Sequence, residues 1–207
     1  MPSNEFIPAL SRNLKSHAGV DNWAMRKLFC FGAAVLILSG LLTACEPSLN
    51  WRASQIEGSN MSFDLPCKPD KTVKPVNMAG LQLELAVVGC EADDAVWAVM
   101  STQVPPTADR DELLQGWRQA TLKNIRASQV EEVPWTPRKI AVLPGSMSIN
   151  ALGFSATGQP VSARAVWFSH VEGNSMRMVH AVVYQNKKNR QNNKQSADQL
   201  IESLKLP

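Results

Sequence analysis

Alternating apolar and polar positions after about residue 60 predict a series of β-strands. The run MSFDLP alternates Met61, Phe63 and Leu65 with polar residues and ends at a proline, as expected of a short strand. Two longer runs, LQLELAVVGC and AVWAVMSTQV, flank the polar EADD and predict a hairpin. Three further runs predict an antiparallel meander: SMSINALGFSA, VSARAVWFSHV and MRMVHAVVYQ.

Two segments change to helical spacing. Residues 109–126 place apolar side chains at helical intervals, and Asp109 followed by Glu112 resembles a capping box. The closing SADQLIESLKL has the same period, with Ser196 and Gln199 as its expected capping pair. Between the first helix and the meander, VEEVPWTPRKIAVLPG contains three prolines, which predicts an irregular segment with one short strand.

The order of these elements predicts one α+β domain over residues 61–207. Hairpin-connected strands with segregated helices favour a largely antiparallel sheet of about six or seven strands, with the helices packed on its faces. Both faces are expected to be covered, because the neighbouring positions Val166 and Trp167 point to opposite faces and are both apolar. Residues 45–60 lack clear periodicity and are expected to form a tether.

An apolar run from Leu28 to Leu42 precedes this domain. Its length of about 15 residues is short of the roughly 20 that a membrane-spanning helix needs. Arg26 and Lys27 stand directly before it and small residues close it, which is the order of a secretory signal. The run ends in four residues that resemble the lipobox of bacterial lipoproteins: Leu42, Thr43, Ala44 and Cys45. An uncleaved anchor helix with an incidental cysteine is the alternative.

The lipobox resemblance implies where the protein resides. It makes Cys45 the lipidated N-terminus of the mature chain, with a diacylglyceryl group and palmitate, and residues 25–44 a signal peptide that starts at Met25. Residues 1–24 are then an extension without a fold. Two or three acyl chains hold a protein durably on a membrane. Glu46 rather than Asp after the cysteine favours the outer over the inner membrane of a bacterial cell envelope, with the domain facing the periplasm.

The remaining cysteines predict a disulfide. Cys30 lies in the expected signal peptide and Cys45 is the expected lipidation site, which leaves Cys67 and Cys90 in a compartment that permits disulfides. Two reduced, buried thiols are the alternative. No metal site is expected, because the chain has no C-x-x-C and its expected mature part has only two histidines. A catalytic thiol would need a nearby base, for which the sequence gives no sign.

Charge and motifs limit the classes of function. The formal net charge is +3, but beyond Cys45 there are 17 basic and 16 acidic side chains, so nothing favours a nucleic-acid partner. The chain lacks G-x-S-x-G, H-E-x-x-H, the P-loop and G-x-G-x-x-G, so neither an enzymatic activity nor a cofactor is expected. If the turn EGNS is symmetric, His170 and His180 lie on opposite faces of the last hairpin and cannot form one site.

One aromatic residue has no periodic partner. Trp135 in VPWTPRK stands between Pro134 and Pro137, and Arg138 and Lys139 follow it. An aromatic anchor with a polar rim is typical of a protein interface, which makes Trp135, Arg138 and Lys139 the candidate interaction residues. The alternative is that the indole caps the core.

Several features together resemble the PsbP/Mog1-like fold, to which DcrB-type bacterial lipoproteins belong: an early FDLP, a hairpin, a helix, a meander that contains Arg164 and a closing LIESLKL. The resemblance covers about residues 58–206 and implies a non-catalytic accessory or interaction module. With the lipobox it predicts a lipid-anchored envelope protein that contacts another, unidentified envelope protein. A carrier for a small apolar ligand is the alternative, and it would need a concave pocket.

We predict that Cys45→Ser abolishes processing and membrane anchoring together, because the thiol is the expected site of lipid attachment. Membrane fractionation and the apparent size of the protein in whole cells measure both effects. A variant that still reaches the membrane pellet at the processed size would contradict the lipoprotein interpretation.

Overall fold

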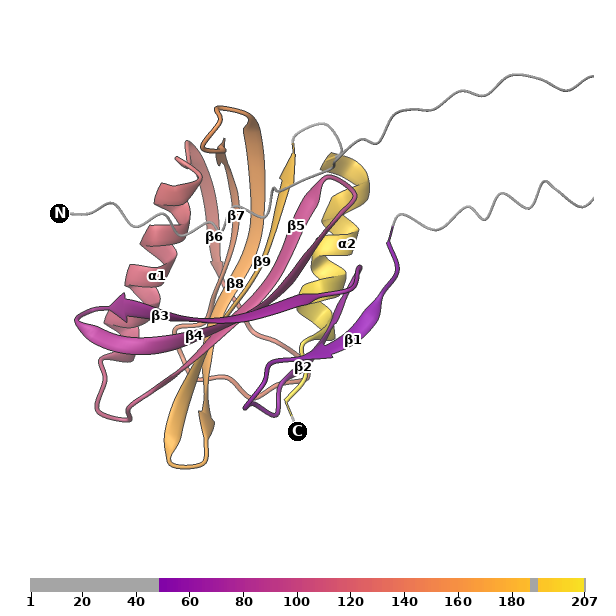
Figure 1. Ribbon diagram of the computed structural model, residues 1–207. Helices are drawn as coiled ribbons and strands as arrows, with labels where there is room; N and C mark the ends of the chain where they lie inside the picture. Colours follow the sequence, from indigo (N-terminus) through magenta and orange to yellow (C-terminus); the bar gives the residue numbers. More distant parts are fainter. Residues whose placement is uncertain (1–48, 187–189, 207) are drawn as a thin grey trace, which may run out of the picture. The chain divides into compact units, whose positions relative to one another are not determined.

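The computed structural model describes residues 49–186 and 190–206, which form two β-sheets and two α-helices (Figure 1). The predicted extension (1–24), the signal peptide (25–44) and Cys45 lie outside the described residues. Neither of the two helices in the described ranges is long and apolar enough to cross a membrane.

The larger sheet has seven strands, and all neighbouring pairs are antiparallel. Their spatial order is β3-β4-β5-β9-β8-β7-β6. The strands are β3 (Asp70–Met78), β4 (Leu81–Ala92), β5 (Ala95–Val104), β6 (Gln129–Pro134), β7 (Met147–Phe154), β8 (Pro160–Glu172) and β9 (Ser175–Asn186). The predicted α+β class and the largely antiparallel sheet of about six or seven strands are confirmed.

The predicted hairpins form with tight turns. The β4–β5 hairpin turns at Asp93 and Asp94, whose φ angles are +51° and +55°. A two-residue hairpin turn needs such angles, and the short side chain of Asp tolerates them. The β8–β9 hairpin pairs His170 with Arg177, as the symmetric turn predicts.

A second, two-stranded sheet consists of β1 (Arg52–Gln55) and β2 (Ser62–Leu65). The run MSFDLP forms β2 as predicted. Strand β1 lies within residues 45–60, where we expected a tether, so regular structure begins before the predicted domain boundary at residue 61. The side chains of β1 are mostly exposed, so its sequence has no apolar alternation. Backbone pairing with β2 and the burial of Ile56 hold this segment in the fold.

Strand β3 was not predicted, because it lies at one edge of the larger sheet with little apolar surface to bury. Val76 is its one fully buried residue. It contains Pro75, which an edge strand tolerates because the missing N–H does not break a ladder on both sides. Pairing with β4 along its whole length stabilises this polar strand.

The two helices begin differently from each other. Helix α1 (Arg110–Asn124) starts as predicted: the Asp109 carboxylate accepts hydrogen bonds from two N–H groups of the first turn, at 3.1 and 3.0 Å. Helix α2 (Arg190–Ser203) starts earlier than predicted, so Ser196 lies inside the helix and is not its N-cap. The preceding RQNNKQ contains neither Gly nor Pro, so nothing in it prevents the helix from extending.

Two clusters of buried apolar side chains hold these elements together. The first contains the apolar residues of α2 and β2, together with Ile56 and their neighbours on the larger sheet, and the second contains those of α1. Successive residues of β5 alternate between them, since Trp97 and Val99 belong to the first cluster and Ala98 to the second. Figure 1 shows α1 and α2 on opposite sides of the long strands. An ion pair of 3.0 Å between Arg164 of β8 and Asp198 of α2 adds a polar contact.

The predicted Cys67–Cys90 disulfide is present. The two Cα atoms are 6.0 Å apart, and the bridge links the segment after β2 to strand β4. Cys90 is buried in the first cluster and Cys67 packs against it. The small sheet is therefore covalently connected to the larger one.

We predict that Cys67→Ala together with Cys90→Ala lowers the free energy of unfolding by about 3 kcal/mol, because the bridge closes a loop over a sequence separation of 23 residues. Urea denaturation of the oxidised parent and the double variant measures the difference. Equal unfolding free energies, or two freely alkylated thiols in the native protein, would contradict this role.

Candidate interaction site

The proline-rich loop between β6 and β7 is fixed to the domain by backbone hydrogen bonds. The Trp135 N–H donates to the Ser146 carbonyl at 2.9 Å, directly after the paired strand ends at Pro134. Farther along, the Leu143 N–H donates to the Ser169 carbonyl of β8 at 2.8 Å. The loop is thus held at both ends, and its middle is positioned by the sheet.

The Trp135 side chain lies between the core and the surface. Its ring packs against Phe168, with the centroids 5.1 Å apart and the planes tilted by 43°. Phe168 is fully buried, whereas Trp135 is only half-buried. Part of the indole therefore covers the first cluster, and part of it remains accessible.

A hollow of about 380 Å³ lies beside Trp135, between this loop and the C-terminal end of α2. Its lining residues are Trp135, Thr136, Pro137, Arg138, Lys139, Ile140, Ile201, Glu202 and Leu204. Ile201 and Leu204 are buried and provide an apolar wall. Arg138, Lys139 and Glu202 are exposed and provide a charged rim.

The charges on this rim are unequal. The loop contributes two cations and α2 contributes one carboxylate. Within the described part of the chain, neither Arg138 nor Lys139 forms an ion pair. The hollow therefore combines aromatic and aliphatic surface with positive charge that an acidic group could neutralise.

The structure brings Trp135, Arg138 and Lys139 together in one hollow. The Trp135 indole packs on the core through Phe168 and also lines the hollow; its role in an interface stays a prediction. Sequence reasoning missed the opposite wall, Ile201 and Leu204, because it assigned the apolar positions of the last helix to the core alone. No local pattern indicates that this helix ends beside the loop.

The two histidines lie on opposite sheet faces, as predicted. His180 pairs with Trp167 across β8 and β9, and its ring stacks on that indole with centroids 4.4 Å apart. The His170 ring Nδ1 lies 3.3 Å from the Val171 carbonyl. Burial lowers the pKa of both rings, and that of His180 falls to about 3. Within residues 49–186 and 190–206, no group of three or more His, Cys, Asp or Glu side chains is placed to hold a metal ion.

Comparison with known proteins adds little. The sequence matches no known protein family, and it matches none of the curated proteins. Among solved structures, it is similar to a protein of unknown function from Pseudomonas aeruginosa, with 8% sequence identity and a TM-score of 0.34. The similarity covers 76% of this chain and 96% of that one. A TM-score this low supports no argument about fold or function.

We predict that His180 makes the stability of the protein pH-dependent. The folded protein keeps this ring neutral down to about pH 3, whereas the unfolded chain protonates it near pH 6.5. Its stabilising contribution is therefore complete above pH 6.5 and decreases as the pH falls toward 3, by about 1.4 kcal/mol per pH unit. Urea denaturation of the parent and His180→Phe between pH 7.5 and 4.5 should show the shallower dependence in the variant. Identical pH dependence would contradict the buried, neutral state of this ring.

Proposed function

We propose that this protein is a lipid-anchored, non-catalytic interaction module of the bacterial cell envelope, tethered through Cys45 and facing the periplasm, with the outer membrane favoured. The lipobox and the apolar run before it support the anchor. The Cys67–Cys90 disulfide is consistent with an oxidising compartment. The hollow between the Trp135 loop and α2 is the proposed contact surface.

The proposed fold is a PsbP/Mog1-like sandwich, in which the helices cover both faces of the antiparallel sheet. Support comes from the two apolar clusters, because one contains α1, the other contains α2, and β5 contributes to both. The order of hairpin, helix, meander and closing helix agrees with that arrangement. Related folds act as accessory modules, which favours binding over catalysis here.

The convergence of Trp135, Arg138 and Lys139 on one hollow is the observation that carries this function. Interfaces commonly place an aromatic residue at the centre and charged groups at the rim. The apolar wall and the two unpaired cations fit a peptide segment with one large apolar side chain next to an acidic one. We therefore propose an envelope protein that presents such a segment as the partner.

Lipid attachment would favour this contact. Confining both partners to one membrane converts binding into a reaction at high effective concentration. A small contact area of this kind can then be sufficient, although in free solution it would bind weakly.

A carrier for a small apolar ligand is the second candidate. A hollow of about 380 Å³ is large enough for a small molecule. Its rim of Arg138, Lys139 and Glu202 is charged, however, and a purely apolar ligand would form no interaction with these groups. Mass spectrometry of the protein released from its native membrane distinguishes the two, because a carrier would bring its ligand with it.

We predict that Arg138→Ala together with Lys139→Ala reduces partner crosslinking several-fold without changing stability, because both side chains are exposed. A photo-crosslinking residue at the exposed Thr136 in intact cells measures the contact. Trp135→Ala should also reduce crosslinking. It should lower the free energy of unfolding by less than about 3 kcal/mol, since the ring is only half-buried.

The matched control is Lys71→Ala together with Lys74→Ala, which removes two exposed cations from the edge strand β3. It should leave crosslinking unchanged. If the Arg138 and Lys139 variant crosslinks like the parent, or if the control loses the same yield, the hollow is not the contact surface.

A further inference from the structure

His180 is the most deeply buried ionisable ring of the domain, and both of its nitrogens lack a hydrogen-bond partner within the described part of the chain. Trp167 stacks on the ring, and Trp117 of α1 meets it edge-on, with centroids 5.4 Å apart and planes at 80°. A buried polar atom without a partner costs about 1–3 kcal/mol, so native proteins rarely keep one without a reason. Packing against two indoles gives neither ring nitrogen a hydrogen-bond partner, so it does not explain why both are buried.

Two methionines occupy strand positions next to this ring. Strand β9 reads Met176-Arg177-Met178-Val179-His180, so Met178 lies on the same sheet face as His180. On the adjacent strand β5, Met100 is directly opposite His180. Directly opposed residues have Cβ atoms about 4.5–5.5 Å apart, and residues two apart along a strand about 7 Å.

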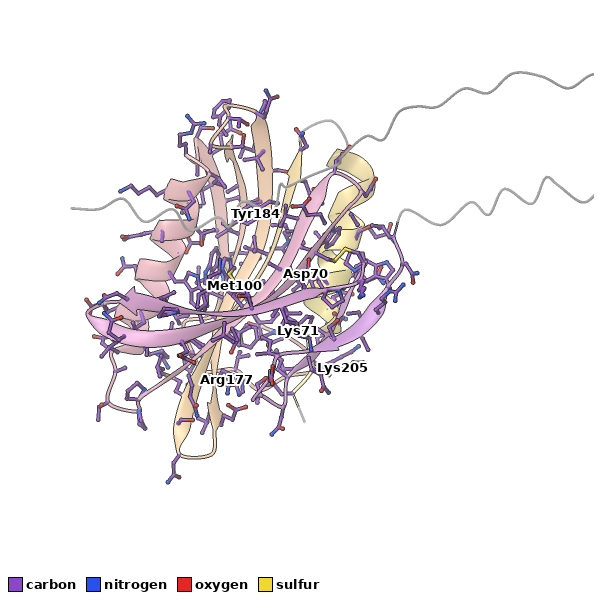
Figure 2. All side chains as sticks on the ribbon, in the orientation of Figure 1. Asp70, Lys71, Met100, Arg177, Tyr184 and Lys205 are labelled. Atoms are coloured by element: carbon purple, nitrogen blue, oxygen red, sulfur yellow. A yellow bond between two sulfur atoms is a disulfide. The ribbon has the colours of Figure 1, made fainter. Side chains whose placement is uncertain are left out.

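The flexibility of these side chains would let both sulfurs reach an ion bound to the imidazole of His180. A methionine side chain has three rotatable bonds and fits many geometries. Met178 is fully buried and Met100 is half-buried, so solvent reaches the group from the Met100 side. Figure 2 shows Met100 in the middle of the larger sheet.

The donor types decide which ion would fit. Thioether sulfur is a soft, neutral donor that selects Cu(I), while imidazole nitrogen binds copper and zinc alike. Hard ions such as Mg²⁺ and Ca²⁺ prefer oxygen ligands. A monovalent ion also costs less to bury among neutral ligands than a divalent one, and the face of Trp167, which stacks on the imidazole, would stabilise a cation further.

We propose that Met100, Met178 and His180 form a binding site for a soft monovalent metal ion, with Cu(I) as the physiological candidate. Coordination would give one of the unpartnered ring nitrogens of His180 a partner. The site is separate from the Trp135 hollow, because it belongs to the second apolar cluster and the hollow borders the first. The absence of a cysteine, histidine or carboxylate metal motif in the sequence is no contradiction, because a site with two methionine ligands does not need one.

The test uses Ag(I), which has the same ligand preference as Cu(I) and needs no reductant that could open the Cys67–Cys90 bridge. It uses the full-length chain in detergent. Every variant carries Cys30→Ser and Cys45→Ser, because a free thiol would bind Ag(I) by itself. We expect binding of one Ag(I) per chain with quenching of tryptophan fluorescence, since two indoles flank His180.

Met100→Leu and Met178→Leu should each weaken Ag(I) binding at least about tenfold, because even changes outside the ligand set commonly cost that much. Methionine to leucine conserves volume, so both variants should remain folded. The matched control is Met61→Leu, a buried methionine of the other cluster, which should bind like the parent. Melting curves of all four proteins verify the fold.

Several results would overturn the proposal. These are a parent that does not bind Ag(I), methionine variants that bind as the parent does, a control that loses the same affinity, or Zn(II) displacing Ag(I) at equal concentration. Folded variants with at least tenfold weaker binding beside an unchanged control would support it.

Discussion

Strand β9 runs through the middle of the larger sheet and is almost completely shielded from water on both faces, so the domain can fold only if something covers both sides of it. Every residue from Met176 to Val183 is buried. The strand pairs with β5 on one side and β8 on the other, and both neighbours are also largely buried. The apolar residues of α1 and α2 belong to the two separate clusters that meet β9. The composition of this strand therefore explains why each helix contributes apolar residues to a different cluster.

Arg177 is the charged exception on β9, and its environment explains how a charge is accommodated there. Its Nε donates to the Glu172 carboxylate at 2.5 Å, and its other nitrogens donate to the Ser101 hydroxyl and to the Gly58 carbonyl, at 3.2 and 2.8 Å. A buried cation is tolerated when its donors are satisfied in this way, whereas removing one partner leaves an uncompensated charge. Because Gly58 lies in the turn between β1 and β2, this guanidinium also positions the small sheet against the larger one.

The elements that could be predicted from the sequence are those with a local signal. The start of α1 is predictable because Asp109 accepts hydrogen bonds from N–H groups only two and three residues away. Strands β7, β8 and β9 are predictable because each contains its own alternation of apolar and polar residues. Strands β1 and β3 have no such signal, because backbone pairing with a neighbour holds them in place while their side chains stay in water. The same limit applies to the candidate sites. The sequence indicates Trp135, because an aromatic residue between two prolines is a local pattern. It does not indicate the wall formed by Ile201 or the pairing of Met100 with His180, because both depend on contacts between distant segments.

The position of the disulfide has a mechanical consequence for a protein held by its N-terminus. The Asn50 N–H donates to the Pro66 carbonyl at 2.7 Å, at the open end of the β1–β2 pair, and Cys67 follows immediately. A pull along the chain from this side would load the backbone hydrogen bonds of the pair one at a time, beginning with that of Asn50, because both chain ends leave the pair at the same end. The load would then pass through the sulfur–sulfur bond directly to β4 and bypass β3. In the proposed lipid-anchored protein, tension would thus reach the seven-stranded sheet at β4 and not at its edge strand β3.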